Sequence, residues 1–231
     1  MVNSIKLYLK AITKDPHAIL NYVIWGRDQM LRRQLEKVLE TDVEKFYEEF
    51  KAMKDFHLSI SNIIETQPQV HISAPRELYA IIRAVKPKVV VETGVGAGVS
   101  SAYILLALRK NGAGMLYSID LPDKSILRGH KPGYAVPYEL RKGWFLVLGP
   151  SKEKLPNLLS MLGGIDIFLH DSEHTYENMT FEFQTSFPYI KDGGMLISHD
   201  IHFNKAFDDF CKRVKRKPVK LWTTGLGIVR K

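Results

Sequence analysis

Acidic and histidine side chains gather in two short windows in the second half of the chain. The first window is His170-Asp171-Ser172-Glu173-His174 and the second is Ser198-His199-Asp200-Ile201-His202. Together they hold four of the eight histidines among 231 residues. Carboxylates and imidazoles bind divalent cations, and an imidazole with a pKa of about 6.5 can take a proton from a hydroxyl group. The two windows therefore indicate a site for acid–base or metal-assisted chemistry.

A glycine-rich turn is the second chemical feature. Residues 91–101 read Val-Glu-Thr-Gly-Val-Gly-Ala-Gly-Val-Ser-Ser, which places glycine at every second position from Gly94 to Gly98. Glycine lets a backbone turn tightly and approach a ligand, and a helix opening near Val99 would offer free N–H groups. Ser100 could cap that helix or donate to the ligand. A dinucleotide fingerprint would need glycine at position 99. The valine there disfavours a nicotinamide oxidoreductase.

An acidic residue, Asp120, ends the apolar segment that follows the turn. A carboxylate at the end of that segment can accept hydrogen bonds from both hydroxyls of a ribose. The alternative is that Asp120 caps a helix or stabilises a turn.

Alternating apolar and amphipathic segments must position these residues. We expect strands at 88–92, 115–120, 144–148, 165–170 and 194–198, helices at 76–85, 99–110, 152–162, 176–189 and 203–214, and a closing hairpin at 219–223 and 227–230. Buried strands between helices predict an α/β fold, a doubly wound seven-stranded sheet, mostly parallel with an antiparallel C-terminal hairpin. Both acid–histidine windows then follow carboxyl ends of strands, where such sheets place their sites.

The N-terminal part of the chain has a different sequence pattern, with helical periodicity and no predicted strand. Residues 28–50 carry apolar side chains at close to helical spacing, and residues 67–75 break the pattern. We therefore expect an N-terminal helical cap over residues 1–75 and a sheet domain over residues 76–231. The apolar stripe of the cap would pack on the sheet domain or on a second subunit. The second arrangement would form a homodimer.

Composition excludes several classes of protein. The single cysteine, Cys211, rules out an internal disulfide framework and a cysteine-based zinc site. No run of about 18 apolar residues is present, so we expect no membrane span. The first 20 residues lack the apolar core and cleavage site of a secretory signal, and the expected location is cytoplasmic.

Positive charge is concentrated in the last 27 residues. This segment holds nine basic and two acidic side chains, and so carries seven of the eight net positive charges. A basic patch of this kind can attract phosphates or acidic partners. The alternative is a solvated helix end and edge strand, where lysine and arginine prevent association between sheets.

The glycine turn resembles motif I of class I S-adenosylmethionine-dependent methyltransferases, in which an acidic residue precedes G-x-G-x-G. The resemblance covers about residues 70–231 and implies a Rossmann-like sheet of seven strands that binds S-adenosylmethionine. In this family the turn cradles the methionine part, the first acid organises the turn, the next acid holds the ribose, and the residues after the third strand contact adenine. The implied cofactor-binding residues are Glu92, Thr93, Gly94, Gly96, Gly98, Ser100, Asp120, Ser151 and Asp171.

The spacing of the two acid–histidine windows resembles that of the metal-dependent O-methyltransferases, including the group named after cephalosporin-cluster methyltransferases. His199 and Asp200 follow Asp171 by 28 and 29 residues. The resemblance implies that Asp171, His199 and Asp200 hold a divalent cation and that His174 is the general base. His199 stands where relatives carry an oxygen ligand. Because added imidazole shifts preference away from Mg²⁺, the expected ion is Mg²⁺ or a transition metal such as Mn²⁺, Fe²⁺ or Zn²⁺.

The leading hypothesis is therefore a metal-assisted O-methyltransferase acting on a small hydroxylated substrate such as a sugar or an aromatic. The acceptor would contact the helical cap or the loop at 121–143, which contains Tyr134 and Tyr138 and is followed by Trp144. Two alternatives remain: a nucleic-acid methyltransferase that uses the basic C-terminal segment, and a non-catalytic module that binds S-adenosylmethionine. The first alternative lacks the N/D-P-P-Y/W motif that amino-group methylation commonly uses.

Overall fold

The computed structural model describes residues 16–65, 74–122, 127 and 129–231. The predicted features at residues 1–15, 66–73, 123–126 and 128 lie outside the described residues. They comprise the start of the helical cap, most of the break at 67–75 and a part of the loop at 121–143. Among the described residues, no helix combines the length and the apolarity that crossing a bilayer requires.

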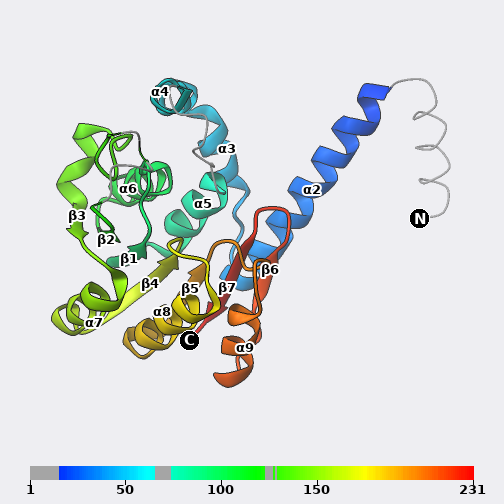
Figure 1. Ribbon diagram of the computed structural model, residues 1–231. Helices are drawn as coiled ribbons and strands as arrows, with labels where there is room; N and C mark the ends of the chain where they lie inside the picture. The colour runs from blue at the N-terminus through cyan, green and yellow to red at the C-terminus, as the bar shows by residue number, and fades with distance from the viewer. Residues whose placement is uncertain (1–15, 66–73, 123–126, 128) are drawn as a thin grey trace.

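A seven-stranded sheet forms the centre of the molecule in the order β3-β2-β1-β4-β5-β7-β6 (Figure 1). Strands β1 to β5 pair in parallel, whereas β7 runs antiparallel to both β5 and β6. This topology confirms the predicted fold class. The strands are β1 Val89–Thr93, β2 Met115–Asp120, β3 Trp144–Leu148, β4 Ile165–His170, β5 Ile190–Ser198, β6 Val219–Leu221 and β7 Leu226–Arg230.

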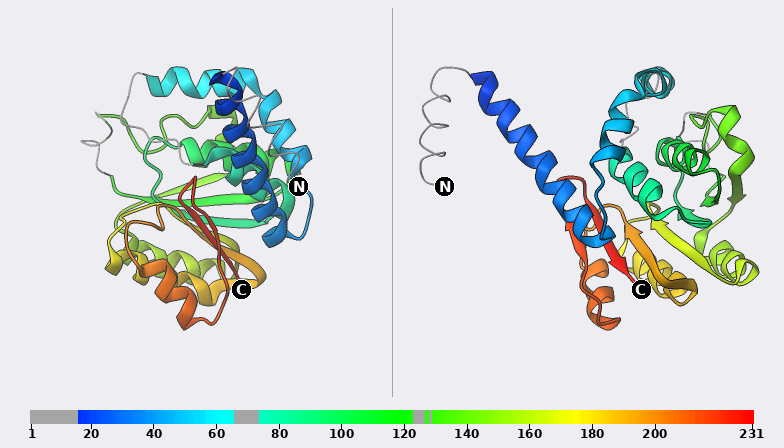
Figure 2. Two further views of the ribbon diagram at one scale, coloured as in Figure 1. Left: turned by 90° about the vertical axis from the view of Figure 1, so that its right-hand side faces the viewer. Right: turned by 180° about the vertical axis from the view of Figure 1, so that it is seen from behind.

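Helices cover both faces of this sheet (Figure 2). Helices α5 (Pro75–Val85) and α6 (Val99–Asn111) pack on one face, and α7 (Ser151–Leu162), α8 (Tyr176–Ser186) and α9 (Ala206–Arg213) pack on the other. Successive side chains of a strand point to opposite faces. Val90 of β1 accordingly belongs to the core beneath α5 and α6, while Val91 belongs to the core beneath α7 to α9. A strand buried on both faces explains the continuous valine run in the sequence.

Three helices precede the sheet, α2 (Pro16–Leu39), α3 (Glu44–Ala52) and α4 (Lys54–Glu65). The prediction of helix across residues 28–50 is wrong between α2 and α3. Glu40 adopts a left-handed conformation with φ 55°, and the Asp42 side chain accepts a hydrogen bond from the Glu44 N–H at 2.8 Å. An aspartate that satisfies a free N–H at a helix start favours such a break. The division into a cap and a sheet domain at residue 75 stays a prediction.

The cap and the first sheet helix share one hydrophobic core. Phe46 and Tyr47 of α3 are buried in the same cluster as Leu78 and Ile82 of α5. Arg83 of α5 also pairs with Glu49 of α3 at 3.0 Å. Helix α2 passes the C-terminal hairpin and projects beyond the sheet (Figure 1).

Several further boundaries differ from the sequence-based expectation. Strand β5 begins at Ile190 rather than at 194, and β6 ends at Leu221 rather than at 223. Helix α8 ends at Ser186 rather than at 189, because Pro188 lies in a 3-10 turn over Phe187–Tyr189. Helix α9 begins at Ala206 rather than at 203, because the Asn204 side chain accepts the Ala206 N–H at 2.8 Å.

Asp166 fixes the amino ends of three strands, and this gives a first prediction. Its carboxylate accepts the N–H groups of Lys88 and Val89 at 2.7 and 2.8 Å and pairs with Lys191 at 2.8 Å. Asp166→Ala leaves two backbone donors without their acceptor, so it should lower the free energy of unfolding by about 1–3 kcal/mol. Chemical denaturation measures this loss. Asp192→Ala, at an exposed position of β5, is the control. Equal stability of both variants would contradict the role of Asp166.

Candidate active site

Two glycines of the turn after β1 allow close backbone contacts. A Cβ atom at Gly94, whose φ is 82°, would lie 2.0 Å from the Asp171 carbonyl oxygen, so no larger residue fits against the end of β4. A Cβ atom at Gly98, whose φ is 92°, would lie 2.7 Å from the Gly133 Cα. Gly96, between them, is exposed and faces open space. The turn is thus pressed against two neighbouring loops and leaves its middle accessible.

Asp120 tethers this turn to the end of β2. One carboxylate oxygen accepts the N–H groups of Val95 and Gly96 at 3.1 and 2.8 Å, and the other accepts the Leu121 N–H at 2.7 Å. Asp120 therefore shapes the turn. Its predicted contact with a ribose stays a prediction.

Glu92 supports the turn from below. It is fully buried, and one carboxylate oxygen accepts hydrogen bonds from the hydroxyls of Ser101 at 2.5 Å and Ser118 at 2.6 Å. Burial raises the pKa of this carboxyl to about 7, although the two serine hydroxyls oppose the shift. Glu92 thus connects the start of α6 to β2 rather than facing a ligand.

A cavity of about 620 Å³ opens at the carboxyl ends of β1, β2 and β4, which is a size suited to a small cofactor. Five of the predicted cofactor-binding residues line it, namely Gly94, Gly96, Asp120, Ser151 and Asp171. Its other walls include Ile119, Leu121, Leu127, Pro150, Ser172 and Asn178. The other four predicted residues, Glu92, Thr93, Gly98 and Ser100, are not among the lining residues. Thr93 instead donates to Glu182 at 2.5 Å.

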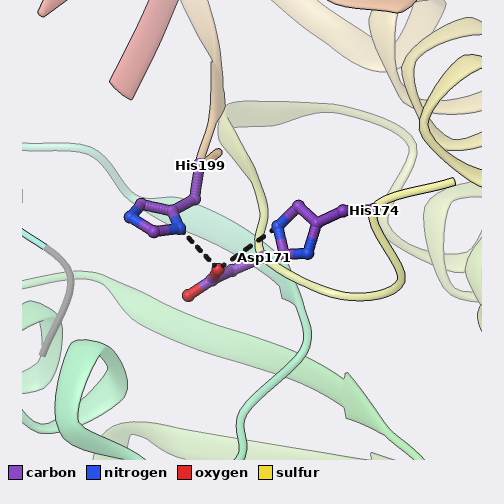
Figure 3. A group of neighbouring side chains, drawn as sticks. All are labelled: Asp171, His174 and His199. Carbon is purple, nitrogen blue, oxygen red and sulfur yellow. Dashed lines mark ion pairs between the residues drawn. The ribbon is translucent and has the colours of Figure 1, made fainter. Parts of the chain in front are cut away.

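The two acid–histidine windows meet beside this cavity (Figure 3). His199 Nδ1 lies 3.1 Å from Asp171 Oδ1 and 3.3 Å from Asp200 Oδ2. His174 Nε2 lies 3.8 Å from each of the same two oxygens. We call Asp171, His174, His199 and Asp200 the cation cluster. The structure therefore brings together the predicted general base and all three predicted metal ligands.

Local backbone geometry makes this convergence possible. His199 and Asp200 are consecutive, and on a continuous strand their side chains would point apart. Strand β5 ends at Ser198, and Asp200 has φ 52°, a left-handed conformation that a non-glycine residue rarely adopts. The bend turns Asp200 toward the cluster. His202 lies at its margin, 3.8 Å from Asp200, and is half exposed.

The surroundings of the two imidazoles in the cluster shift their pKa values in opposite directions. Burial would lower the pKa of His199, but the adjacent carboxylate of Asp171 and the charge of Asp200 raise it above its usual value. Burial and the neighbouring His170 lower the pKa of His174 despite the two aspartates. His174 is therefore held more strongly in its neutral, proton-accepting form.

The cation cluster has the ligand chemistry of a divalent metal site. Among the described residues, Asp171, His174 and His199 each offer one ligand atom, and these atoms lie within 4.8 Å of one another. His174 Nε2 and His199 Nδ1 are buried and make no hydrogen bond. Buried polar atoms without partners are costly, and a cation would satisfy both nitrogens. The residues present therefore fit a cation held by two imidazoles and carboxylate oxygens.

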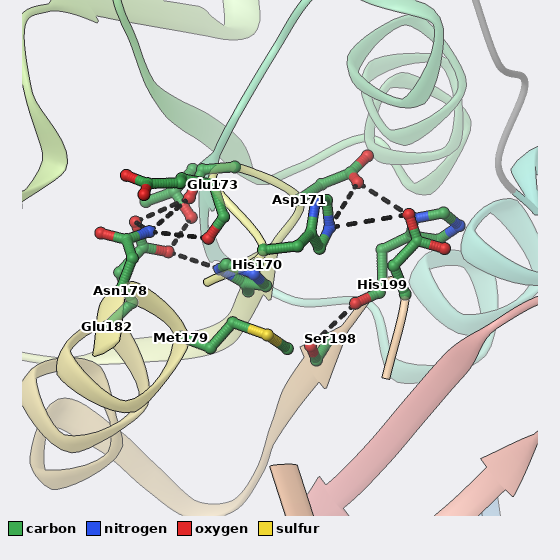
Figure 4. A network of polar contacts seen from close by, with 12 residues as sticks. His170, Asp171, Glu173, Asn178, Met179, Glu182, Ser198 and His199 are labelled. Atoms are coloured by element: carbon green, nitrogen blue, oxygen red, sulfur yellow. Dashed lines mark hydrogen bonds and ion pairs between the residues drawn. The ribbon is translucent and has the colours of Figure 1, made fainter. Parts of the chain in front are cut away.

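Sequence reasoning missed Glu182 and left His170 unassigned. His170 points away from the cluster, and its Nδ1 lies 2.7 Å from Glu182 Oε2 (Figure 4). Both side chains are fully buried. The sequence pattern of an amphipathic helix predicts that its glutamates are exposed to solvent. The one available signal is its position between two phenylalanines, Phe181 and Phe183.

A second cavity, of about 440 Å³, lies between the helical cap and the C-terminal hairpin. The hairpin turn reaches the cation cluster, because the Gly225 carbonyl accepts the Ile201 N–H at 3.2 Å. A Cβ atom at Gly225 would lie 3.4 Å from Asp200 Oδ1. The lining residues of the second cavity are Asp28, Leu31, Phe50, Arg76, Glu77, Thr223 and Thr224.

The aromatic residues of the loop at 121–143 line neither cavity. Trp144 begins β3 and donates from its indole to the Ser118 hydroxyl at 2.7 Å. Tyr138 is 87% exposed.

Several basic residues of the C-terminal segment have acidic partners within the chain. Lys220 pairs with Asp208, and Lys212 pairs with Asp209 at 3.3 Å. Arg230 pairs with Glu40 of the cap region at 3.4 Å. These pairs use part of the positive charge to hold α9 and the hairpin.

Comparisons with known proteins bear on this architecture. Residues 91–201 match the sequence profile of a family described as a methyltransferase domain. Among curated proteins, a sequence search finds no match.

Solved structures share the fold at low sequence identity. A methyltransferase from Podospora anserina with bound S-adenosylhomocysteine is 13% identical, with a TM-score of 0.55 over 77% of this chain and 86% of that chain. A proposed caffeoyl-CoA O-methyltransferase from Staphylococcus aureus is 17% identical, with a TM-score of 0.59 over 78% and 98%. A methyltransferase from Geobacter sulfurreducens is 18% identical, with a TM-score of 0.57 over 77% and 88%. Residues 91–201 are thus similar to a methyltransferase domain, and the chain shares the fold of these three methyltransferase structures.

Proposed function

We propose that the protein transfers a methyl group from S-adenosylmethionine to a hydroxyl oxygen of a small molecule, with the help of a divalent cation. The observation that carries this proposal is the double position of Asp171. Asp171 lines the larger cavity, and its carboxylate also belongs to the cation cluster. A donor in that cavity and an acceptor oxygen at the cluster would therefore be neighbours, as direct methyl transfer requires.

The larger cavity is the proposed donor site. The exposed Gly96 and the carboxylate of Asp120 offer a close backbone approach and hydrogen-bond acceptors to a nucleoside with a sulfonium tail. Asp171 adds negative charge near the sulfonium, and Ser151 contributes a hydroxyl group. Glu92 and Thr93 act from behind by fixing the turn.

The cation cluster is the proposed acceptor-activating site, held by Asp171, His199 and Asp200. When bound, a divalent cation would lower the pKa of an acceptor hydroxyl and fix its oxygen for attack. His174 takes the hydroxyl proton on its Nε2, and its lowered pKa keeps this nitrogen free to accept it. His174 Nε2 is equally close to both aspartates, so the same nitrogen can alternatively complete the ligand set.

The second cavity is the proposed acceptor site, and its lining favours a neutral, hydroxyl-rich ring. Arg76 already pairs with Asp28 and Glu77 at 3.0 and 2.8 Å, so the three charges sum to a negative value that disfavours anions. Threonine hydroxyls and these charged groups can donate to and accept from substrate hydroxyls, while Phe50 offers an apolar ring face. This balance supports a sugar over a catechol-like aromatic. A cytoplasmic location and a homodimer remain part of the proposal.

The metal content tests the cation cluster. Protein purified without chelator should contain a transition metal, because imidazole ligands favour Mn²⁺, Fe²⁺ or Zn²⁺ over Mg²⁺. His199→Ala should weaken Mn²⁺ binding by at least about tenfold in calorimetry, since even indirect support of a metal site contributes that much. His130→Ala, in the loop before β3, is the control. Stoichiometric magnesium with affinity unchanged by His199→Ala would contradict the assignment.

The role of His174 is tested by His174→Ala. Loss of a general base should reduce turnover by about 100-fold to 10,000-fold, while S-adenosylhomocysteine should still raise the melting temperature. Because the pKa of His174 is lowered, the acidic limb of the wild-type kcat/KM profile should lie below pH 6.5. Mn²⁺ affinity separates the two roles, since it falls only when His174 is a ligand. Undiminished turnover would rule out both.

The proposed acceptor site is tested by filling the second cavity. Thr223→Trp should reduce methyl transfer to neutral methyl hexosides by at least about tenfold through steric exclusion, because affinity changes of this size need only about 1.4 kcal/mol. Stabilisation by S-adenosylhomocysteine should not change. Lys217→Trp, at an exposed position outside the lining residues, is the matched control. Faster transfer to catechol or to hexose phosphates than to hexosides would contradict the substrate class.

A further inference from the structure

Glu182 of α8 is a fully buried carboxylate with four hydrogen-bond partners (Figure 4). Its Oε2 accepts from the Thr93 hydroxyl at 2.5 Å and from His170 Nδ1 at 2.7 Å. Its Oε1 accepts from the Ser172 hydroxyl at 2.8 Å and from the Asn178 amide at 3.1 Å. Each oxygen thus accepts two hydrogen bonds. These bonds offset the cost of burying a charged carboxylate.

The partners of Glu182 belong to both of the proposed ligand sites. Thr93 ends β1 directly before the glycine turn, and Ser172 and Asn178 line the larger cavity. His170 ends β4 directly before Asp171, and its ring lies 5.2 Å from the His174 ring, edge to face. One carboxylate therefore holds the wall of the donor cavity and the strand end that carries the cation cluster.

This hydrogen-bond pattern depends on a carboxylate at position 182. The hydroxyls of Thr93 and Ser172, the Asn178 amide and His170 Nδ1 can all donate, and a carboxylate can accept all four. Although burial would raise it, the hydrogen bond and charge of His170 hold the pKa of Glu182 below its usual value, which keeps the carboxylate ionised. A glutamine amide would present a donor to two of these donors and lose their hydrogen bonds.

We propose that Glu182 is a positioning residue that couples the two sites, so that filling the donor cavity orders the cation cluster and binding a cation orders the donor cavity. The inference rests on the proposed function. A ligand that fixes Ser172 and Asn178 fixes the two donors to Glu182 Oε1. The carboxylate is rigid, so Oε2 then fixes Thr93 and His170, and with His170 the backbone of Asp171.

Coupling of this kind is reciprocal and can be measured without turnover. If Mn²⁺ tightens the binding of S-adenosylhomocysteine by some factor, S-adenosylhomocysteine must tighten Mn²⁺ binding by the same factor. Calorimetric titration of each ligand, alone and with the other saturating, gives this factor. We expect about fivefold or more for the wild-type chain, which is the lower end of measured couplings.

Glu182→Gln should bring the coupling factor close to one, while each ligand alone still binds. Glu177→Gln is the matched control, because Glu177 lies on the same helix and is exposed. Thr93→Val and Ser172→Ala each break a single link, and each should reduce the factor, so the proposal stays testable if Glu182→Gln fails to fold. A purely stabilising role would lower the melting temperature and leave the factor unchanged.

Three outcomes overturn the proposal. A wild-type factor of one with both ligands bound would show that the sites are independent. A factor that Glu182→Gln, Thr93→Val and Ser172→Ala all leave unchanged would show that coupling takes another route. Failure of the wild-type chain to bind either ligand would reject the proposed function itself, and the coupling with it.

Discussion

The contact between the ends of β1 and β4 determines the arrangement of the whole site. The Asp171 N–H donates to the Thr93 carbonyl at 2.9 Å, and the Asp171 carbonyl packs against Gly94 so closely that a side chain at 94 has no room. Strand β5 joins through the His199 N–H, which donates to the His170 carbonyl at 2.9 Å. Three strand ends are thereby fixed by backbone contacts alone. Asp171 can therefore line the cavity while its carboxylate faces the cation cluster.

The buried charges near these strand ends divide into two kinds. Glu182 has every oxygen satisfied by protein donors, so it is part of the framework. His174 Nε2 and His199 Nδ1 are buried without a hydrogen bond, beside two carboxylates. Proteins retain such unsatisfied groups at functional sites, because a ligand supplies the missing partner. Buried atoms without a hydrogen bond also occur at Glu92 Oε2 and His170 Nε2, so the two nearby carboxylates are what distinguish His174 and His199 as ligand-binding residues.

The sequence was sufficient for the fold and for the composition of the cluster. Valine-rich strands alternating with helices predict the sheet, and topology alone then brings Asp171 and His199 to one edge. The contacts of individual side chains could not be predicted. Asp120 holds the glycine turn, and Glu92 lies beneath it, because hydrogen-bond geometry in three dimensions decides which oxygens face the cavity. Glu182 was missed for the same reason, since helical spacing does not show that Thr93 and His170 face it.

The second cavity takes its walls from segments that the donor cavity does not use. Arg76 and Phe50 come from the helices before β1, and Thr223 comes from the turn between β6 and β7. In contrast, Gly94, Asp120 and Ser151 lie at or just after the ends of β1, β2 and β3. Substitutions can therefore accumulate in one set of walls without disturbing the other. Evolution or engineering can therefore change the acceptor that the protein modifies while the residues that would bind the methyl donor stay the same.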